Sequence, residues 1–163
     1  QLKCHVTSSA VAVVDALRAL GAERIALVSP YSDNLTHMSI AYWSSRGFSV
    51  GPVAKVIGNI PGGTHPIYGL ESGDAMHALE TLRGSMFDAV VLLGTGMPTL
   101  RALIAHPQLE GAPVFSCTFA LAWRCVRALE GAPASGDSLR AWIAGGAGDD
   151  WRERYRQRSL NPR

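Results

Sequence analysis

The fold class follows from residues 88–100, DAVVLLGTGMPTL. Residues 89–93 are an apolar, β-branched run that ends at Gly94, and Pro98 then opens a helical pattern. This order predicts a buried strand, a tight turn and a helix. Because ligands of open parallel α/β sheets sit at the carboxyl ends of strands, this turn is the first place where we expect a site.

Three further apolar runs have the character of strands, and helical patterns separate them. A serine caps the helix before the first run, and Asp33 or Asn34 caps the helix after it. The second run contains Pro52, which favours the edge of a sheet. Right-handed crossovers make such a chain a parallel, doubly wound sheet. The sequence therefore predicts the α/β class with four parallel strands, at 24–30, 48–58, 89–93 and 112–118.

Two segments between the strands have features of their own. In the helix after the first strand, Leu35, Met38 and Tyr42 share one face, as in an amphipathic helix. Residues 59–73 carry four glycines and two prolines, which fits a functional lid or a mobile surface loop. His65 in that segment is a candidate acid/base group, or an exposed loop histidine.

Length and charge argue for one domain without a strongly charged partner. The chain has 163 residues, 15 basic and 13 acidic, with a formal net charge of +2, so we expect no binding to nucleic acid or membrane. We place the lobe at residues 1–133, followed at 134–163 by a linker, a short helix and an arginine-rich tail. That tail is a solvated terminus or a phosphate-binding segment.

The three cysteines, Cys4, Cys117 and Cys125, show no metal-ligand spacing and no disulfide framework. No apolar run approaches the roughly 20 residues that a membrane-spanning helix needs. We expect a soluble, cytoplasmic protein. The histidines fall at unrelated spacings, and GTG at 94–96 lacks the third glycine of a dinucleotide-binding fingerprint, so no cofactor and no metal are expected.

Three segments carry a resemblance to a known family: VVDALRALGAERIALVSPY at 13–31, LLGTGMPTL at 92–100 and FALAWRCVRALEG at 119–131. They resemble the aspartate/glutamate/hydantoin racemase superfamily, on the branch of arylmalonate decarboxylase and maleate cis-trans isomerase. The resemblance implies a flavodoxin-like lobe, one of two that clasp a small dicarboxylate. The other lobe would then precede Gln1 or lie on a partner chain, and a homo-oligomer fits this as well.

The resemblance also assigns roles to residues. Tyr31 matches a tyrosine whose hydroxyl helps to hold a substrate carboxylate. Gly94 stands where the family has a catalytic cysteine, and neither it nor Thr95 can exchange a proton with carbon. Thr95 and the amides near Gly96 can still bind a carboxylate.

Three more residues at strand ends are candidates for the same pocket. Cys117 is a candidate for a displaced catalytic thiol, and the alternative is a buried cysteine that packs as a small apolar residue. Ser29 and Ser116 are candidate lining residues, since they end the first and fourth predicted strands.

Two functions remain open at this point. One is an arylmalonate decarboxylase-like or maleate isomerase-like enzyme, which acts on a small dicarboxylic acid by cysteine-assisted proton transfer or addition at carbon. The substitution at Gly94 would impair it. The other is a non-catalytic carboxylate-binding or regulatory domain. Tyr31 favours the enzyme, and the missing cysteine favours the binding domain.

Overall fold

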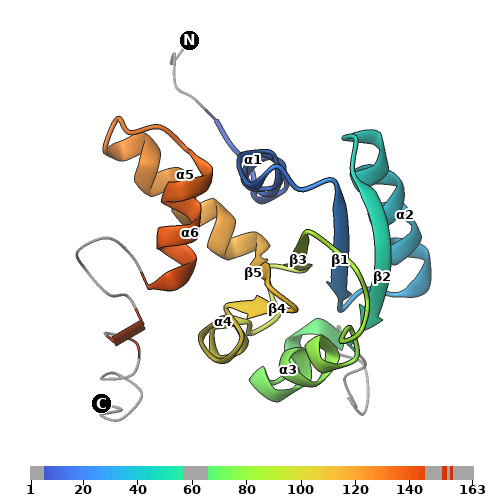
Figure 1. Ribbon diagram of the computed structural model, residues 1–163. Coiled ribbons are helices and arrows are strands. Elements are labelled where there is room, and N and C mark those ends of the chain that lie inside the picture. Colours follow the sequence, from blue (N-terminus) through green and yellow to red (C-terminus); the bar gives the residue numbers. More distant parts are fainter. Residues whose placement is uncertain (1–5, 57–65, 146–151, 154, 156–163) are drawn as a thin grey trace.

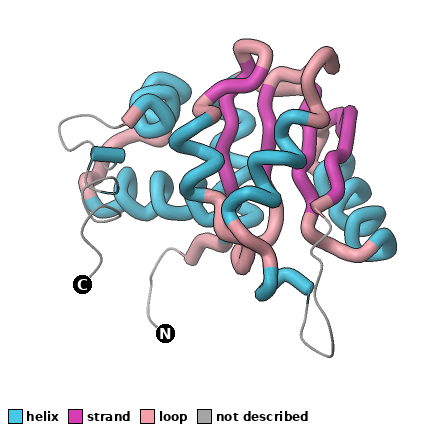
Figure 2. Tube along the Cα trace, turned by 90° about the horizontal axis from the view of Figure 1, so that it is seen from below, coloured by secondary structure: helices cyan, strands magenta, loops and turns pink. Residues whose placement is uncertain are grey.

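A computed structural model describes residues 6–56, 66–145, 152, 153 and 155. It contains a five-stranded sheet in the order β2-β1-β3-β5-β4. Helices α3 and α4 cover one face, and α1, α2, α5 and α6 cover the other (Figures 1 and 2). In chain order the elements are α1 (Ser9–Leu20), β1 (Arg24–Ser29), α2 (Asp33–Ser45), β2 (Ser49–Lys55), the 3-10 turn η1 (Pro66–Gly69), α3 (Ser72–Glu80), β3 (Ala89–Leu92), α4 (Leu100–Ala105), β4 (Gln108–Leu109), β5 (Ala112–Ser116), α5 (Cys117–Leu129) and α6 (Gly136–Ala144).

The four predicted strands are confirmed, and all of them are parallel. β1 pairs with β2 and β3, and β3 pairs with β5. β2 lies at the edge of the sheet, as Pro52 predicted, because a proline has no amide to donate to a further strand. β1, β3 and β5 are apolar almost throughout because both of their faces are covered by helices.

A fifth strand, β4, adds to the predicted sheet. It runs antiparallel to β5, with Leu109 opposite Ala112. Glu110 and Gly111 join the two strands with φ angles of 49° and 82°, the two positive values of a tight hairpin turn. The short sequence QLEGAP gives only four strand residues around this turn, too few for a period-2 pattern, which is why the sequence did not predict the hairpin.

The first helix follows its sequence signals closely. The Ser8 hydroxyl accepts a hydrogen bond from the Val11 amide at 3.3 Å, and Gly21 ends the helix with a φ of 68°. In α2 the cap differs from the prediction, because Ser32 accepts from the Leu35 amide at 3.4 Å. Asp33 is instead the first residue of that helix.

Helix α6, in the segment after residue 133, packs against α1 and β5. α6 buries Leu139 and Ile143 in the same core as β5 and α1. The Trp123 indole donates to the Ser138 hydroxyl at 3.2 Å, which ties α6 to α5. Arg152 donates to the backbone carbonyl of Ile143 at 2.7 Å, so this arginine of the tail is bound to the lobe.

Some predictions concern residues outside the described part of the chain. They are Cys4, His65 and residues 59–65 of the predicted loop, together with Arg154, Arg156, Arg158 and Arg163 of the tail. Within the described ranges, no helix has the length and apolar character that spanning a membrane requires.

Candidate functional site

A cavity of about 430 Å³ opens at the carboxyl ends of β1 and β3. Four residues that the sequence singled out line it together: Tyr31, Gly94, Thr95 and Cys117. They follow β1, β3 and β5, three strands that lie side by side in the sheet. The parallel pairing therefore brings residues that are far apart in the sequence to one edge.

Tyr31 and Cys117 both carry a proton at neutral pH. Burial raises the pKa of the Tyr31 hydroxyl, the neighbouring Cys117 adds to the rise, and a hydrogen bond from the Gly94 backbone opposes it. Burial raises the pKa of the Cys117 thiol to about 11, although the backbones of Gly94 and Cys117 itself lower it. The cavity thus holds a phenol and a thiol as neutral donors, around the backbone of Gly94.

The backbone conformation of Gly94 and the atoms around it both disfavour a side chain at this position. Its φ is 82°, in the left-handed region that glycine adopts at little cost. A Cβ built on it would lie 2.7 Å from Cγ of Pro30 and 2.9 Å from Cδ1 of Ile67. In this conformation the position has no room for the cysteine side chain that the resemblance would place there.

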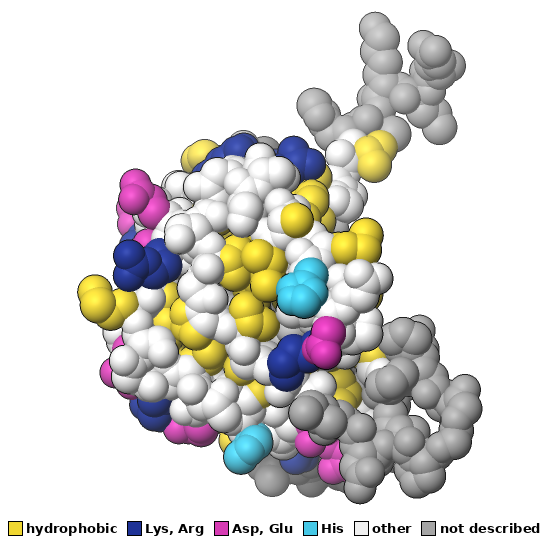
Figure 3. Space-filling view, turned by 90° about the vertical axis from the view of Figure 1, so that its right-hand side faces the viewer, with side chains coloured by type: hydrophobic (Ala, Val, Ile, Leu, Met, Phe, Trp, Pro, Cys, Tyr) yellow, Lys and Arg dark blue, Asp and Glu magenta, His cyan; other side chains and the backbone are white. Residues whose placement is uncertain are grey.

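One face of α2 forms the apolar wall of the cavity. Leu35, Met38, Ser39 and Tyr42 line it at the i, i+3, i+4 and i+7 spacing of one helical face. Leu35 is 42% exposed and Met38 61%, and hydrophobic side chains gather at the surface on the α2 and β2 side of the molecule (Figure 3). The apolar stripe that the sequence predicted therefore exists and lines the cavity, and Tyr42 also packs against the core.

Ser39 adds a hydroxyl to this wall that the sequence analysis did not identify. The indole nitrogen of Trp43 donates to its Oγ at 3.0 Å. Because Ser39 accepts in that bond, its own proton is free to donate to a bound molecule. The signal in the sequence was the i, i+4 spacing of Ser39 and Trp43, which has meaning only once the cavity is known.

Two helix N-termini, and not a cationic side chain, make the cavity favourable for an anion. Among its lining residues in the described part of the chain, none is charged at neutral pH. The first turn of α1, at Ser9 and Ala10, and the first residue of α5, Cys117, border it. Helix N-termini carry partial positive charge and amides without intrahelical partners, so these two ends favour a carboxylate.

Three predicted lining residues do not face this cavity. Ser29 is fully buried and its hydroxyl lies 2.9 Å from that of Thr36. Ser116 caps α5 by accepting from the Phe119 amide at 3.2 Å. A Cβ built on Gly96 would lie 3.6 Å from side-chain carbons of Ile67. All three positions are at or beyond strand ends, but none of them is among the residues that line the cavity.

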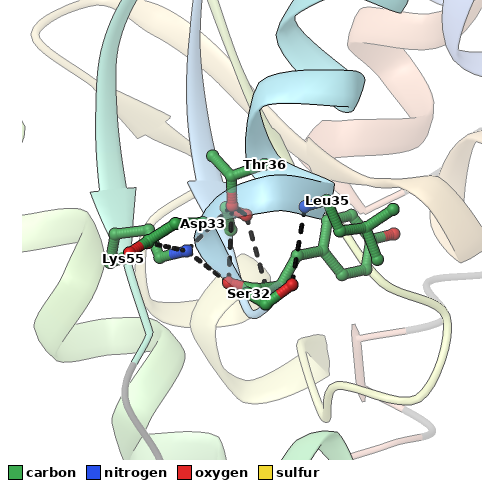
Figure 4. A network of polar contacts seen from close by, with 7 residues as sticks. Ser32, Asp33, Leu35, Thr36 and Lys55 are labelled. Carbon is green, nitrogen blue, oxygen red and sulfur yellow. Dashed lines mark hydrogen bonds and ion pairs between the residues drawn. The ribbon is translucent and has the colours of Figure 1, made fainter.

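A polar network behind Tyr31 was also missed. Lys55, at the end of β2, donates to the Tyr31 carbonyl and, at 2.8 Å, to the Thr36 hydroxyl. It also forms an ion pair with Asp33 at 3.2 Å. Figure 4 shows Lys55 reaching across to Asp33 and Thr36 at the start of α2. A lysine at the end of an edge strand gives no signal in a sequence, because it is typical of solvated strand ends.

No group of three His, Cys, Asp or Glu residues that could hold a metal ion occurs in the described ranges.

Comparison with known proteins gives a consistent result. The family model for arylmalonate decarboxylase matches residues 1–139. The maleate isomerase of Nocardia farcinica (strain IFM 10152) is 34% identical over 141 residues, which cover 83% of this chain and 54% of the relative. The maleate isomerase of Geobacillus stearothermophilus is 34% identical over 130 residues, covering 76% and 49%.

Solved structures agree. Nocardia farcinica maleate cis-trans isomerase, as a mutant with a covalently bound succinylcysteine intermediate, superposes with a TM-score of 0.66 at 32% identity, covering 85% of this chain and 57% of that one. A crystal structure of arylmalonate decarboxylase gives a TM-score of 0.63 at 24% identity, covering 73% and 52%, which supports the shared fold. This chain spans about half the length of the curated relatives it matches.

Proposed function

Because this chain belongs to the arylmalonate decarboxylase family, we propose that its cavity binds a substituted malonate and that Cys117 protonates the carbon left after loss of carbon dioxide. The observation that carries this proposal is the convergence of the Tyr31 hydroxyl, the Cys117 thiol and the Gly94 backbone in one cavity.

Binding uses neutral donors and helix ends. Tyr31, Thr95 and Ser39 line one cavity, and each bond that such a hydroxyl makes to a carboxylate contributes roughly 1.5–3 kcal/mol. The N-termini of α1 and α5 add partial positive charge. Opposite them, the α2 wall of Leu35 and Met38 offers apolar surface to the substituent on the malonate carbon.

The reaction requires one proton from the protein. When a malonate loses carbon dioxide, the electron pair of the broken carbon–carbon bond stays on the central carbon, which becomes part of an enediolate. The Cys117 thiol then gives its proton to this carbon, and the resulting thiolate regains a proton from water. The hydroxyl and amide donors that bind the substrate carboxylate also stabilise the enediolate, as they would an oxyanion.

The state of Cys117 favours this role over addition to a double bond. A succinylcysteine, as in the Nocardia farcinica structure, requires a thiolate to attack carbon. With a thiol pKa of about 11, on the order of one Cys117 in ten thousand is a thiolate at pH 7. A proton donor, by contrast, has to be protonated, which Cys117 is.

A second function, carboxylate binding without turnover, is supported by a different observation. The position of the family's cysteine is closed to any side chain, because a Cβ at Gly94 would overlap Pro30. The chain would then have kept the carboxylate-binding donors and lost the acid/base group.

Incubation of the purified chain with phenylmalonate in deuterated water separates these functions. We expect phenylacetate with one deuterium on the former malonate carbon, measured by mass spectrometry. Cys117→Ala should abolish the product, whereas Cys125→Ser, at an exposed position on α5, should retain it. Tyr31→Phe should raise KM, since it removes one carboxylate donor.

Product formation that survives Cys117→Ala would refute the role of Cys117. Calorimetric binding of phenylmalonate without any product would support the binding function instead. Absence of both binding and turnover, for phenylmalonate and for maleate, would refute a dicarboxylate site in this cavity.

A further inference from the structure

Lys55 occupies an unusual place for a lysine at the end of an edge strand. Its side chain is only 29% exposed, and the ammonium group lies behind the turn that carries Tyr31. The chain contains one other lysine, Lys3, so Lys55 is the sole ammonium side chain of the described ranges. Such a group stays this far from solvent only where it finds acceptors.

Three acceptors match its three donors. They are the Tyr31 carbonyl, the Thr36 hydroxyl at 2.8 Å and the Asp33 carboxylate at 3.2 Å. An ammonium on a flexible stem can reach three acceptors in different directions, whereas the planar fork of an arginine suits two oxygens in one plane. The site is therefore specific for lysine in its geometry as well as in its charge.

The same network also holds the amide of Tyr31, through Ser29 and Thr36. The Tyr31 amide donates to the Ser29 hydroxyl at 3.4 Å, and Ser29 bonds to Thr36 at 2.9 Å. The Thr36 hydroxyl in turn donates to the Tyr31 carbonyl at 3.4 Å. Both peptide groups of Tyr31 are thus held by side chains from β1, β2 and α2, which leaves its ring as the one part directed to the cavity.

We propose that Lys55 is a positioning residue for the candidate site. By fixing the Tyr31 backbone to β2 and α2, it keeps the Tyr31 hydroxyl beside Cys117 and Gly94, where a ligand carboxylate would meet all three. The inference rests on the proposed function for the identity of the ligand, but the placement of Tyr31 can be tested without any ligand.

Asp33 provides a matched control. Its side chain is 90% exposed, so its ion pair with Lys55 is largely screened by water. Asp33→Asn keeps the bonds from Lys55 to Tyr31 and Thr36, whereas Lys55→Met keeps the aliphatic stem and removes the donors. The two variants separate the contact with Tyr31 from the surface ion pair.

The first measurement is the affinity for phenylmalonate by calorimetry. Loss of a bond from a charged donor predicts roughly tenfold weaker binding for Lys55→Met, and less than a twofold change for Asp33→Asn. In a Tyr31→Phe background, Lys55→Met should have no further effect, because Lys55 acts through the Tyr31 hydroxyl. A full tenfold loss in that background too would overturn the proposal, as would no loss in the wild-type background.

The second measurement needs no ligand. In a chain with Cys4→Ser and Cys125→Ser, Cys117 is the remaining thiol, and Tyr31 lies beside it. Lys55→Met should raise the rate of Cys117 alkylation by iodoacetamide, and Asp33→Asn should leave that rate unchanged. An unchanged alkylation rate in Lys55→Met would overturn the proposal. The free energy of unfolding of each variant is measured in urea, because a less stable variant also exposes Cys117 by unfolding globally. An increase in rate that matches this loss of stability would overturn the proposal as well.

The two measurements keep the proposals distinct. If the wild-type chain binds neither phenylmalonate nor maleate, the proposed function fails, while the alkylation rates still decide whether Lys55 positions Tyr31.

Discussion

Gly94→Ala is the sharpest test of the geometry at the centre of the site. An alanine at a φ of 82° costs roughly 1–2 kcal/mol, because its Cβ approaches the following carbonyl. That Cβ would also lie 2.7 Å from Cγ of Pro30, whose ring cannot rotate away, and 2.9 Å from the more flexible end of Ile67. Overpacking of this kind adds about 1–3 kcal/mol, so we expect the free energy of unfolding to fall by roughly 2–5 kcal/mol.

The assay is urea unfolding followed by circular dichroism, with Gly84→Ala as the matched control. Gly84 has a φ of 77°, but a Cβ there would meet nothing within 4 Å, so the control should show only the backbone cost. Pro30→Ala should restore part of the loss when combined with Gly94→Ala, because it removes the rigid contact. The reasoning is refuted if Gly94→Ala destabilises the chain no more than Gly84→Ala does.

Three other predictions follow from single groups. The Cys117 thiol has an ordinary pKa of 9.0 in the unfolded chain and about 11 in the folded one, so the folded chain holds its proton longer and stability falls as pH rises from 9 to 11. The wild type should lose about 2 kcal/mol more than Cys117→Ala over that range in urea unfolding. Ser39→Ala should weaken phenylmalonate binding in calorimetry and also lower stability by about 1–2 kcal/mol, since it leaves the buried Trp43 indole without its acceptor. Asp88→Ala should cost about 1 kcal/mol in thermal unfolding, because the Asp88 carboxylate accepts the amides of Glu23 and Arg24 at 2.9 and 2.7 Å in a solvent-exposed position. These two amides lower the Asp88 pKa, so its contribution should disappear as pH falls below the ordinary value of 3.8.

The sheet was predictable because its signals are local. Ser8 and Gly21 bracket α1, and the apolar run before Gly94 forms β3 as predicted. The corners that line the cavity also followed from sequence, since residues just after parallel strands share one edge. Tyr31, Gly94, Thr95 and Cys117 come together for that reason.

The features that could not be predicted from the sequence depend on contacts between distant segments. An apolar stripe such as that of Leu35 and Met38 looks the same whether it faces a core or a cavity. Likewise, a serine at a strand end can point into a pocket or inward, and Ser29 points inward because the Thr36 hydroxyl is there to bond it. Lys55 is part of the site only through partners that belong to other elements.

The walls of the cavity come from several segments of the chain. The start of α1, the Tyr31 turn with α2, the end of β3 and the start of α5 each contribute a part. A molecule bound there would hold these four segments together, and each depends on the central strands being paired. Occupancy and global unfolding are therefore linked, so a tight ligand should slow amide exchange in β1 and β3 themselves, and not only around its own contacts.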